Sequence, residues 1–120
     1  MCGTPYYLSP EIVQSKPYNV KTDVWSMGVM LYELCALKPP FDAPSIHMLS
    51  MKIVRGVYNP LPSTFSKEIK DLVKVMLDVR PESRPDVNKI LSMPVIQRRI
   101  KNFLTESVKH VEFSHTVLHK

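Results

Sequence analysis

Glycine is scarce in this chain of 120 residues, which has three glycines against 11 prolines. Gly3, Gly28 and Gly56 stand far apart, so the chain contains no glycine-rich loop that could wrap the phosphates of a nucleotide. Cysteine is also scarce, and Cys2 and Cys35 alone do not make a disulfide framework. A reducing compartment is the default for such a chain, so we expect an intracellular, cytoplasmic protein.

Long apolar runs are missing too. Gly28, Tyr32 and Glu33 interrupt the longest one before it reaches the length of a membrane span. The first residues show no basic region followed by an apolar stretch, so no signal peptide is expected. The sequence therefore predicts no membrane contact.

What is present is the composition of an ordinary globular domain, with 44% hydrophobic and 22% charged residues. The net charge is +5, and part of the excess lies late in the chain. An acidic partner or nucleic acid would be one interpretation. We favour a solvated helix face with a basic tail, because no aromatic residues alternate with the charges as a base-stacking surface requires. We therefore expect no nucleic-acid partner.

Apolar residues recur at helical spacing, and this predicts a mainly α fold. Residues 24–37 are apolar nearly all round, which is typical of a helix in the middle of a core. Thr22 and Asp23 supply its predicted N-cap. Ser45 is expected to cap a second helix that runs to about Arg55, and Gly56 to end it.

Three more helices are predicted toward the C-terminus. Ser66 caps the first of them, Pro85 lies in the first turn of a short second one, and Pro94 opens the third. The pattern fades from Ser107, so residues 107–120 are expected to form a flexible tail. The histidines of this tail match no known metal-ligand spacing, so no metal site is assigned to them; they are His110, His115 and His119.

Four sequence motifs carry a family resemblance. They are Gly-Thr-Pro-Tyr-Tyr-Leu-Ser-Pro-Glu at residues 3–11, Lys-Pro-Tyr-Asn at 16–19, Asp-Val-Trp-Ser-Met-Gly at 23–28 and Leu-Tyr-Glu-Leu-Cys-Ala-Leu at 31–37. The first resembles the end of a protein-kinase activation segment, with Ser-Pro-Glu in place of Ala-Pro-Glu. Together they resemble the NIMA-related serine/threonine kinases. The resemblance implies a truncated kinase-like fold over residues 1–106, the helical lower half of a kinase large lobe.

The resemblance also implies a substrate pocket. Thr4 matches the residue that hydrogen-bonds the catalytic aspartate in serine/threonine kinases. Met1, Pro5 and Leu8 match positions that line the pocket for the substrate residue after the phosphoacceptor. An apolar wall of this kind favours an apolar substrate side chain, and ordinary turn and packing roles are the alternative.

Structural roles follow from the same resemblance. Glu11 is expected to form a buried ion pair with Arg84, whose planar guanidinium offers two parallel hydrogen bonds. Asp23 matches an aspartate that accepts bonds from the catalytic loop in the family, and here it could cap its own helix instead. Trp25 and Gly28 are expected to serve as a core anchor and a close-packing site.

The 120 residues contain no Val-Ala-Ile-Lys, His-Arg-Asp or Asp-Phe-Gly motif. Phosphoryl transfer depends on these parts for positioning the nucleotide and its Mg²⁺. We therefore assign no catalytic, cofactor-binding or metal-binding residue and expect the chain alone to be inactive. The full-length relative implied by the resemblance would transfer the γ-phosphoryl group of Mg-ATP to serine or threonine of proteins.

Two alternatives remain beside a partial kinase. The chain could be a non-catalytic interaction module, or a competitor, that binds protein substrates and partners through the activation-segment end and its helices. A small basic nucleic-acid-binding protein is the other, and the density of motifs argues against it. An association with the cytoskeleton or the cilium is implied by the family resemblance alone.

Overall fold

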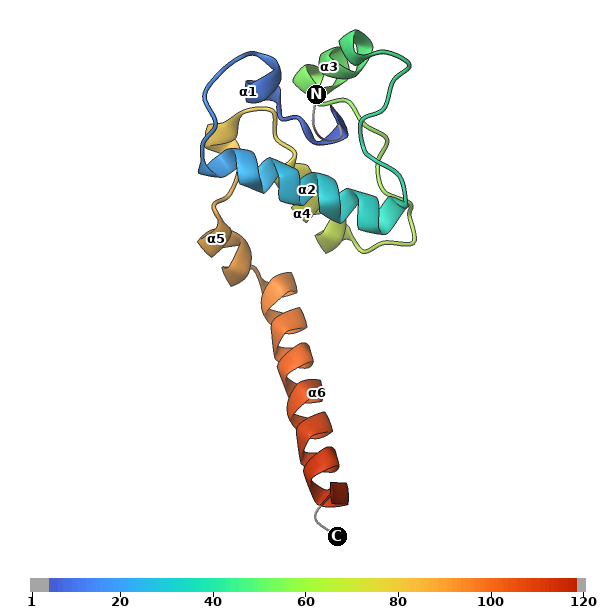
Figure 1. Cartoon of the computed structure of the whole chain (residues 1–120), viewed down its shortest axis with the longest axis vertical. Helices are drawn as coiled ribbons and strands as arrows, with labels where there is room; N and C mark the ends of the chain where they lie inside the picture. The colour runs from blue at the N-terminus through green and yellow to red at the C-terminus, as the bar shows by residue number, and fades with distance from the viewer. Residues whose placement is uncertain (1–4, 119–120) are drawn as a thin grey trace. The chain divides into compact units, whose positions relative to one another are not determined.

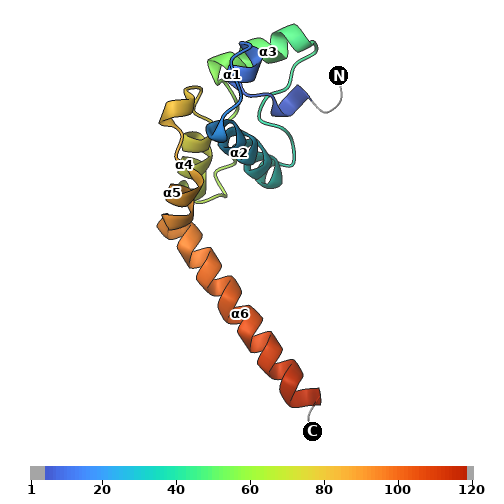
Figure 2. The same cartoon turned by 60° about the vertical axis from the view of Figure 1, so that its left-hand side comes forward.

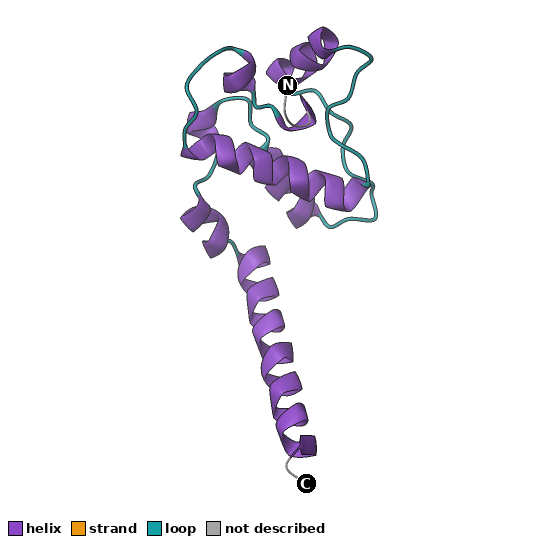
Figure 3. Ribbon diagram, in the orientation of Figure 1, coloured by secondary structure: helices purple, strands orange, loops and turns teal. Residues whose placement is uncertain are grey.

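The structure, a computed structural model, describes residues 5–118, with side chains described for residues 6–111. Every regular element in this part of the chain is helical, and none is a strand (Figure 3). The mainly α fold predicted from the sequence is confirmed. The elements are η1 (Pro5–Tyr7), α1 (Pro10–Val13), α2 (Val20–Ala36), α3 (Ile46–Arg55), α4 (Lys67–Met76), η2 (Pro81–Ser83), α5 (Val87–Ser92) and α6 (Pro94–Leu118).

The chain forms two compact units, one up to Val87 and one from Asn88 onward. In the first unit α2 packs on α4 and α1 packs on α3, as both views of the ribbon show (Figures 1 and 2). The centre of its core is aromatic: the Trp25 and Phe41 rings stack with centroids 5.5 Å apart, and Tyr58 meets Phe41 edge to face. The buried cluster consists of Trp25, Val29, Tyr32, Phe41, Leu49, Ile53, Leu61, Val73 and Leu77.

Helix α2 begins at Val20, earlier than predicted. Its N-cap is Asn19, whose side chain accepts a hydrogen bond from the backbone N–H of Lys21 at 2.8 Å. Thr22 completes a reciprocal capping box by accepting from the backbone N–H of Asn19 at 3.1 Å. The prediction that Thr22 and Asp23 form the N-cap is therefore wrong, because Asn19 provides a capping oxygen one turn earlier.

Helix α2 is also less enclosed than its sequence suggested. Val24, Trp25 and Val29 on one face are buried, but Met30 is 54% exposed and Leu34 76% exposed on the other. The prediction that all sides of this helix lie within the core is therefore wrong for the described chain. Helix α4 covers one face of α2, and apolar composition alone does not say how many neighbours a helix has.

The ends of α3 and α4 were predicted from their caps, and these predictions are confirmed. Ser45 accepts from the Met48 backbone N–H at 3.2 Å, and Ser66 accepts from that of Ile69 at 3.3 Å. Gly56 ends α3 with φ +66°, a left-handed conformation that side chains disfavour.

The second unit contains α6 and all of α5 except its first residue. Helix α5 begins at Val87, two residues after Pro85, and Pro94 opens α6 as predicted. Helix α6 continues to Leu118, so its helical backbone extends beyond residue 106, where the sequence pattern fades. The division into a kinase part and a flexible tail at this residue stays a prediction. No helix among the described residues combines the length and the apolarity that crossing a membrane needs.

Candidate functional site

The candidate site is built on α1, a helix of four residues that begins within the Ser-Pro-Glu motif. Ser9 is its N-cap and accepts a hydrogen bond from the backbone N–H of Ile12 at 3.3 Å. Pro10 occupies the first helical position, where its missing N–H costs nothing. Glu11 follows in the first turn, and its side chain is turned into the protein.

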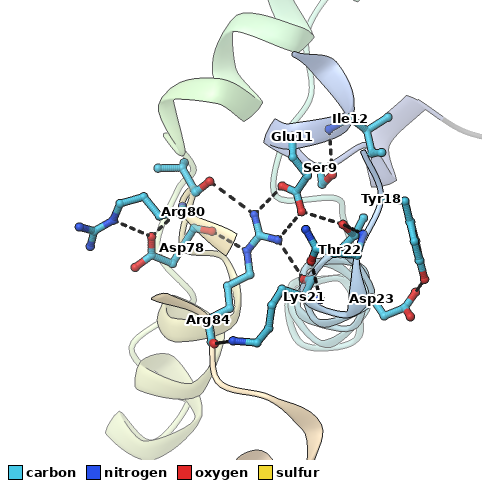
Figure 4. A network of polar contacts seen from close by, with 12 residues as sticks. Ser9, Glu11, Ile12, Tyr18, Lys21, Thr22, Asp23, Asp78, Arg80 and Arg84 are labelled. Carbon is cyan, nitrogen blue, oxygen red and sulfur yellow. Dashed lines mark hydrogen bonds and ion pairs between the residues drawn. The ribbon is translucent and has the colours of Figure 1, made fainter. Parts of the chain in front are cut away.

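The structure brings Glu11 and Arg84 together as a bidentate ion pair (Figure 4). Arg84 donates from Nη1 to Oε2 of Glu11 at 2.7 Å and from Nη2 to Oε1 at 2.8 Å. Glu11 is 2% exposed and Arg84 1% exposed, so both charges are removed from water. A buried pair of this geometry ties α1 to the segment after η2, 73 residues later in the chain.

The rest of the Arg84 guanidinium is also satisfied. Its Nε donates to the backbone oxygen of Asp78 at 2.7 Å, and Nη1 donates to that of Lys21 at 2.9 Å. Its central carbon lies 5.0 Å from the centroid of the Trp25 ring, which is a cation–π contact. In return, the ammonium group of Lys21 donates to the backbone oxygen of Arg84 at 2.5 Å. Arg84 therefore joins α1, α2 and η2 at one point.

Thr22 extends this network, and the sequence analysis missed its role. Its hydroxyl accepts from the backbone N–H of Asn19 and donates to Oε2 of Glu11 at 2.8 Å. One side chain thus completes the cap of α2 and holds the carboxylate of α1. The Asn-x-x-Thr spacing at residues 19–22 was the available signal, because it is the spacing of a reciprocal cap.

The electrostatics of the site favour the charged form of Glu11. Burial alone would raise the pKa of this carboxyl, but the hydrogen bonds from Arg84, from the backbone and from Thr22 outweigh it. The pKa of Glu11 falls from an ordinary 4.5 to about 2. The site is therefore ionised at neutral pH, which suits a structural clamp and not a proton carrier.

The predicted substrate-pocket residues are only partly within the described structure. Met1 and Thr4 lie outside the described residues, and the backbone of Pro5 begins η1. Leu8 is half-buried and packs against the core cluster. The structure places Leu8 beside the capped start of α1, but the pocket itself stays a prediction.

Two of the three predicted core residues, Trp25 and Gly28, lie in the interior, and the third, Asp23, does not. Trp25 is fully buried, and a Cβ added to Gly28 would lie 2.9 Å from Cβ of Met76, so this position requires close packing. Asp23 is exposed and accepts a hydrogen bond from the hydroxyl of Tyr18. Its assignment to the core, and its possible capping role, are therefore wrong, because Asn19 caps α2 and leaves Asp23 on the outer face.

A second polar contact links η1 to α2. The Tyr7 hydroxyl donates to the Glu33 carboxylate, and this bond raises the pKa of Tyr7. The two residues border a shallow hollow of about 230 Å³ whose other lining residues are Met30, Leu34 and Leu37. Glu33 therefore has a positioning partner that its sequence environment did not reveal.

No three His, Cys, Asp or Glu side chains among the described residues lie close enough together to hold a metal ion. The ion pair of Glu11 is internal, so it is not free to coordinate a ligand. We assign no step of phosphoryl transfer to these residues.

Comparison with known proteins agrees with the motifs. The family model of the protein kinase domain matches residues 1–96. Human serine/threonine-protein kinase Nek5 is 47% identical over 116 residues, which are 97% of this chain and 16% of the human protein. Putative serine/threonine-protein kinase A of Trypanosoma brucei brucei is 44% identical over 116 residues, or 97% of this chain and 27% of that protein. Mouse Nek1 is 42% identical over 118 residues, which are 98% of this chain and 10% of the mouse protein.

The chain thus spans a small part of the length of these relatives. Within that part, the similarity covers both Glu11 and Arg84, together with the helices that they connect. The chain belongs to the protein kinase domain family, and its relatives are NIMA-related serine/threonine kinases.

Proposed function

We propose that this chain is the substrate-facing, helical part of a serine/threonine kinase domain. In this function η1 and α1 present the end of the activation segment to a protein substrate, while α2, α4 and η2 hold it in place. The transferase activity with Mg-ATP belongs to a complete kinase domain. The 120 residues alone are inactive under this proposal.

The observation that supports the proposal most strongly is the buried Glu11–Arg84 pair. It fixes a helix of four residues that would not persist alone. The exposed apolar face of α2 supports it as well, because Met30 and Leu34 would be covered when a kinase domain is completed. Met1, Thr4, Pro5 and Leu8 are then proposed to meet the substrate, with a preference for an apolar residue after the phosphoacceptor.

A chimera tests the proposal directly. The 116 residues of human Nek5 that match this chain would be replaced by the corresponding residues of this chain. We expect the chimera to phosphorylate serine or threonine peptides with a rate near that of the Nek5 parent. A folded chimera that binds Mg-ATP but transfers no phosphate would overturn the proposal. A positional peptide library on the same chimera would test the expected preference for an apolar residue.

The isolated chain provides the complementary measurement. We expect no saturable binding of Mg-ATP by calorimetry, because the motifs that position it are not among these residues. Binding with a defined stoichiometry would show that the site assignment is wrong.

A non-catalytic interaction module is the second candidate function. The exposed methionines of α3 favour it, since Met48 and Met51 offer an apolar surface within a folded unit. A cooperative melt and a monomeric state in solution would favour this function. Aggregation of the isolated chain would favour the partial kinase, whose α2 face then lacks its cover. An intracellular, cytoplasmic location is proposed for either.

A further inference from the structure

The outer side of α3 carries an apolar groove that the proposed kinase role does not use. The groove has a volume of about 310 Å³ and is lined by Met48, Met51, Lys52, Arg55 and Val57. Its floor is formed by the two methionines and the valine, all of which are exposed. Methionine side chains are flexible and polarisable, so such a floor adapts to different apolar side chains.

The rim of the groove is basic. The ammonium group of Lys52 donates to the backbone oxygen of Asp42 at 2.7 Å, a neutral partner that leaves its charge uncompensated. Arg55 forms no ion pair within the described part of the chain. The groove therefore combines an apolar floor with two available positive charges.

The surface around the groove carries further positive charges. Val57 also borders two neighbouring hollows, to which Lys38 and Lys74 contribute. The same hollows also hold two carboxylates, Asp42 and Asp78, and Asp78 forms an ion pair with Arg80 at 3.5 Å. Asp42 keeps its charge, because the backbone N–H of Ala43 that it accepts from at 2.8 Å is neutral. The cations of this surface, Lys38, Lys52, Arg55 and Lys74, thus outnumber the negative charge of Asp42, and a ligand meets a surface that is positive on balance.

We propose that the α3 groove docks an acidic peptide segment of a partner protein, with one or two long apolar side chains on the methionines and flanking carboxylates at Lys52 and Arg55. The apolar floor provides the contact area, and the basic rim selects acidic over basic segments. This docking needs neither ATP nor a complete kinase domain. It can therefore fail or succeed independently of the proposed function.

Selection from a random peptide display library against the full chain tests this proposal. We expect the enriched peptides to carry Leu, Met or Phe beside Asp or Glu. Their synthetic versions should bind at least tenfold more weakly to Arg55→Glu and to Met51→Gln. Arg99→Glu on α6 makes the same change of charge at an exposed site outside the groove, and it should leave binding within twofold of the parent.

The variants need a fold control, and several outcomes of the peptide selection would overturn the proposal. The substituted side chains of the groove are exposed, so circular dichroism of both variants should match that of the parent. Enrichment of basic peptides, or of none, would overturn the proposal. Equal weakening by Arg55→Glu and Arg99→Glu would overturn it too, because it would reduce the effect to net charge. Binding that survives Met51→Gln would show that the groove is not the site.

Discussion

Removing the charge of Glu11 tests the clamp between α1 and the rest of the first unit. Glu11→Gln keeps the shape of the side chain but leaves the guanidinium of Arg84 buried without an opposing charge. Removing one partner of a buried pair costs about 3–5 kcal/mol. The pKa of Glu11 gives a second figure: at about 1.4 kcal/mol per pKa unit, the fall from 4.5 to about 2 corresponds to about 3–4 kcal/mol.

The two figures agree, so we expect Glu11→Gln to lower the free energy of unfolding by about 3 kcal/mol or more. For a chain of this size the melting temperature should fall by roughly 10 °C or more. The assay is urea and thermal unfolding at pH 7, followed by far-ultraviolet circular dichroism. Glu82→Gln, at an exposed glutamate in η2, is the matched control and should leave stability unchanged. If Glu11→Gln melts within a degree of the parent, the reasoning is refuted.

The pH dependence of stability follows from the same carboxylate. Its pKa in the folded protein lies below its ordinary value, so its contribution is complete above about pH 4.5 and is lost as the pH falls toward 2. The parent should therefore lose about 3 kcal/mol more than Glu11→Gln over this window. The two stability curves should converge at its acid end. Parallel curves across the window would show that the lowered pKa of Glu11 does not stabilise the fold.

Two further substitutions probe neighbouring features by the same unfolding measurement. Thr22→Val removes the hydroxyl that joins Asn19 and Glu11 and should cost about 2 kcal/mol, while Thr22→Ser should retain most of the stability. Equal losses in both would contradict the hydroxyl's role. Gly56→Ala should cost about 1–3 kcal/mol, because φ is +66° and the new Cβ would lie 2.7 Å from Cγ1 of Val79. In a Val79→Ala background this cost should shrink, and an unchanged cost would assign it to the backbone alone.

Much of the helical framework could be predicted because its signals are local. Ser45 and Ser66 each lie three residues before the N–H group that they bond, so the sequence shows the cap and its target together. Gly56 ends α3 for a reason that depends only on its own φ angle. These predictions needed no knowledge of which helices meet.

The errors at α2 have a different physical origin. Three polar residues within five positions, Asn19, Thr22 and Asp23, have side chains that can cap a helix. Each of them could therefore be the N-cap of α2. The structure uses Asn19 and Thr22 reciprocally, which places Asp23 outside. The exposure of Met30 and Leu34 depends on which elements surround the helix, and a run of apolar residues carries no information about that.

The Glu11–Arg84 pair shows where sequence reasoning depends on family resemblance. No periodicity links two residues that are 73 positions apart, and the pairing was expected only from the matched motifs. The remaining hydrogen-bond partners of Arg84 are the backbone oxygens of Lys21, Asp78 and Val79, which any residue type could supply. Yet these bonds make the burial of the guanidinium possible, because a buried cation needs all its donors satisfied. Helix α1 is too short to be stable alone. Its position therefore depends in part on hydrogen bonds to backbone oxygens, and the amino-acid sequence does not show which backbone oxygens will be used.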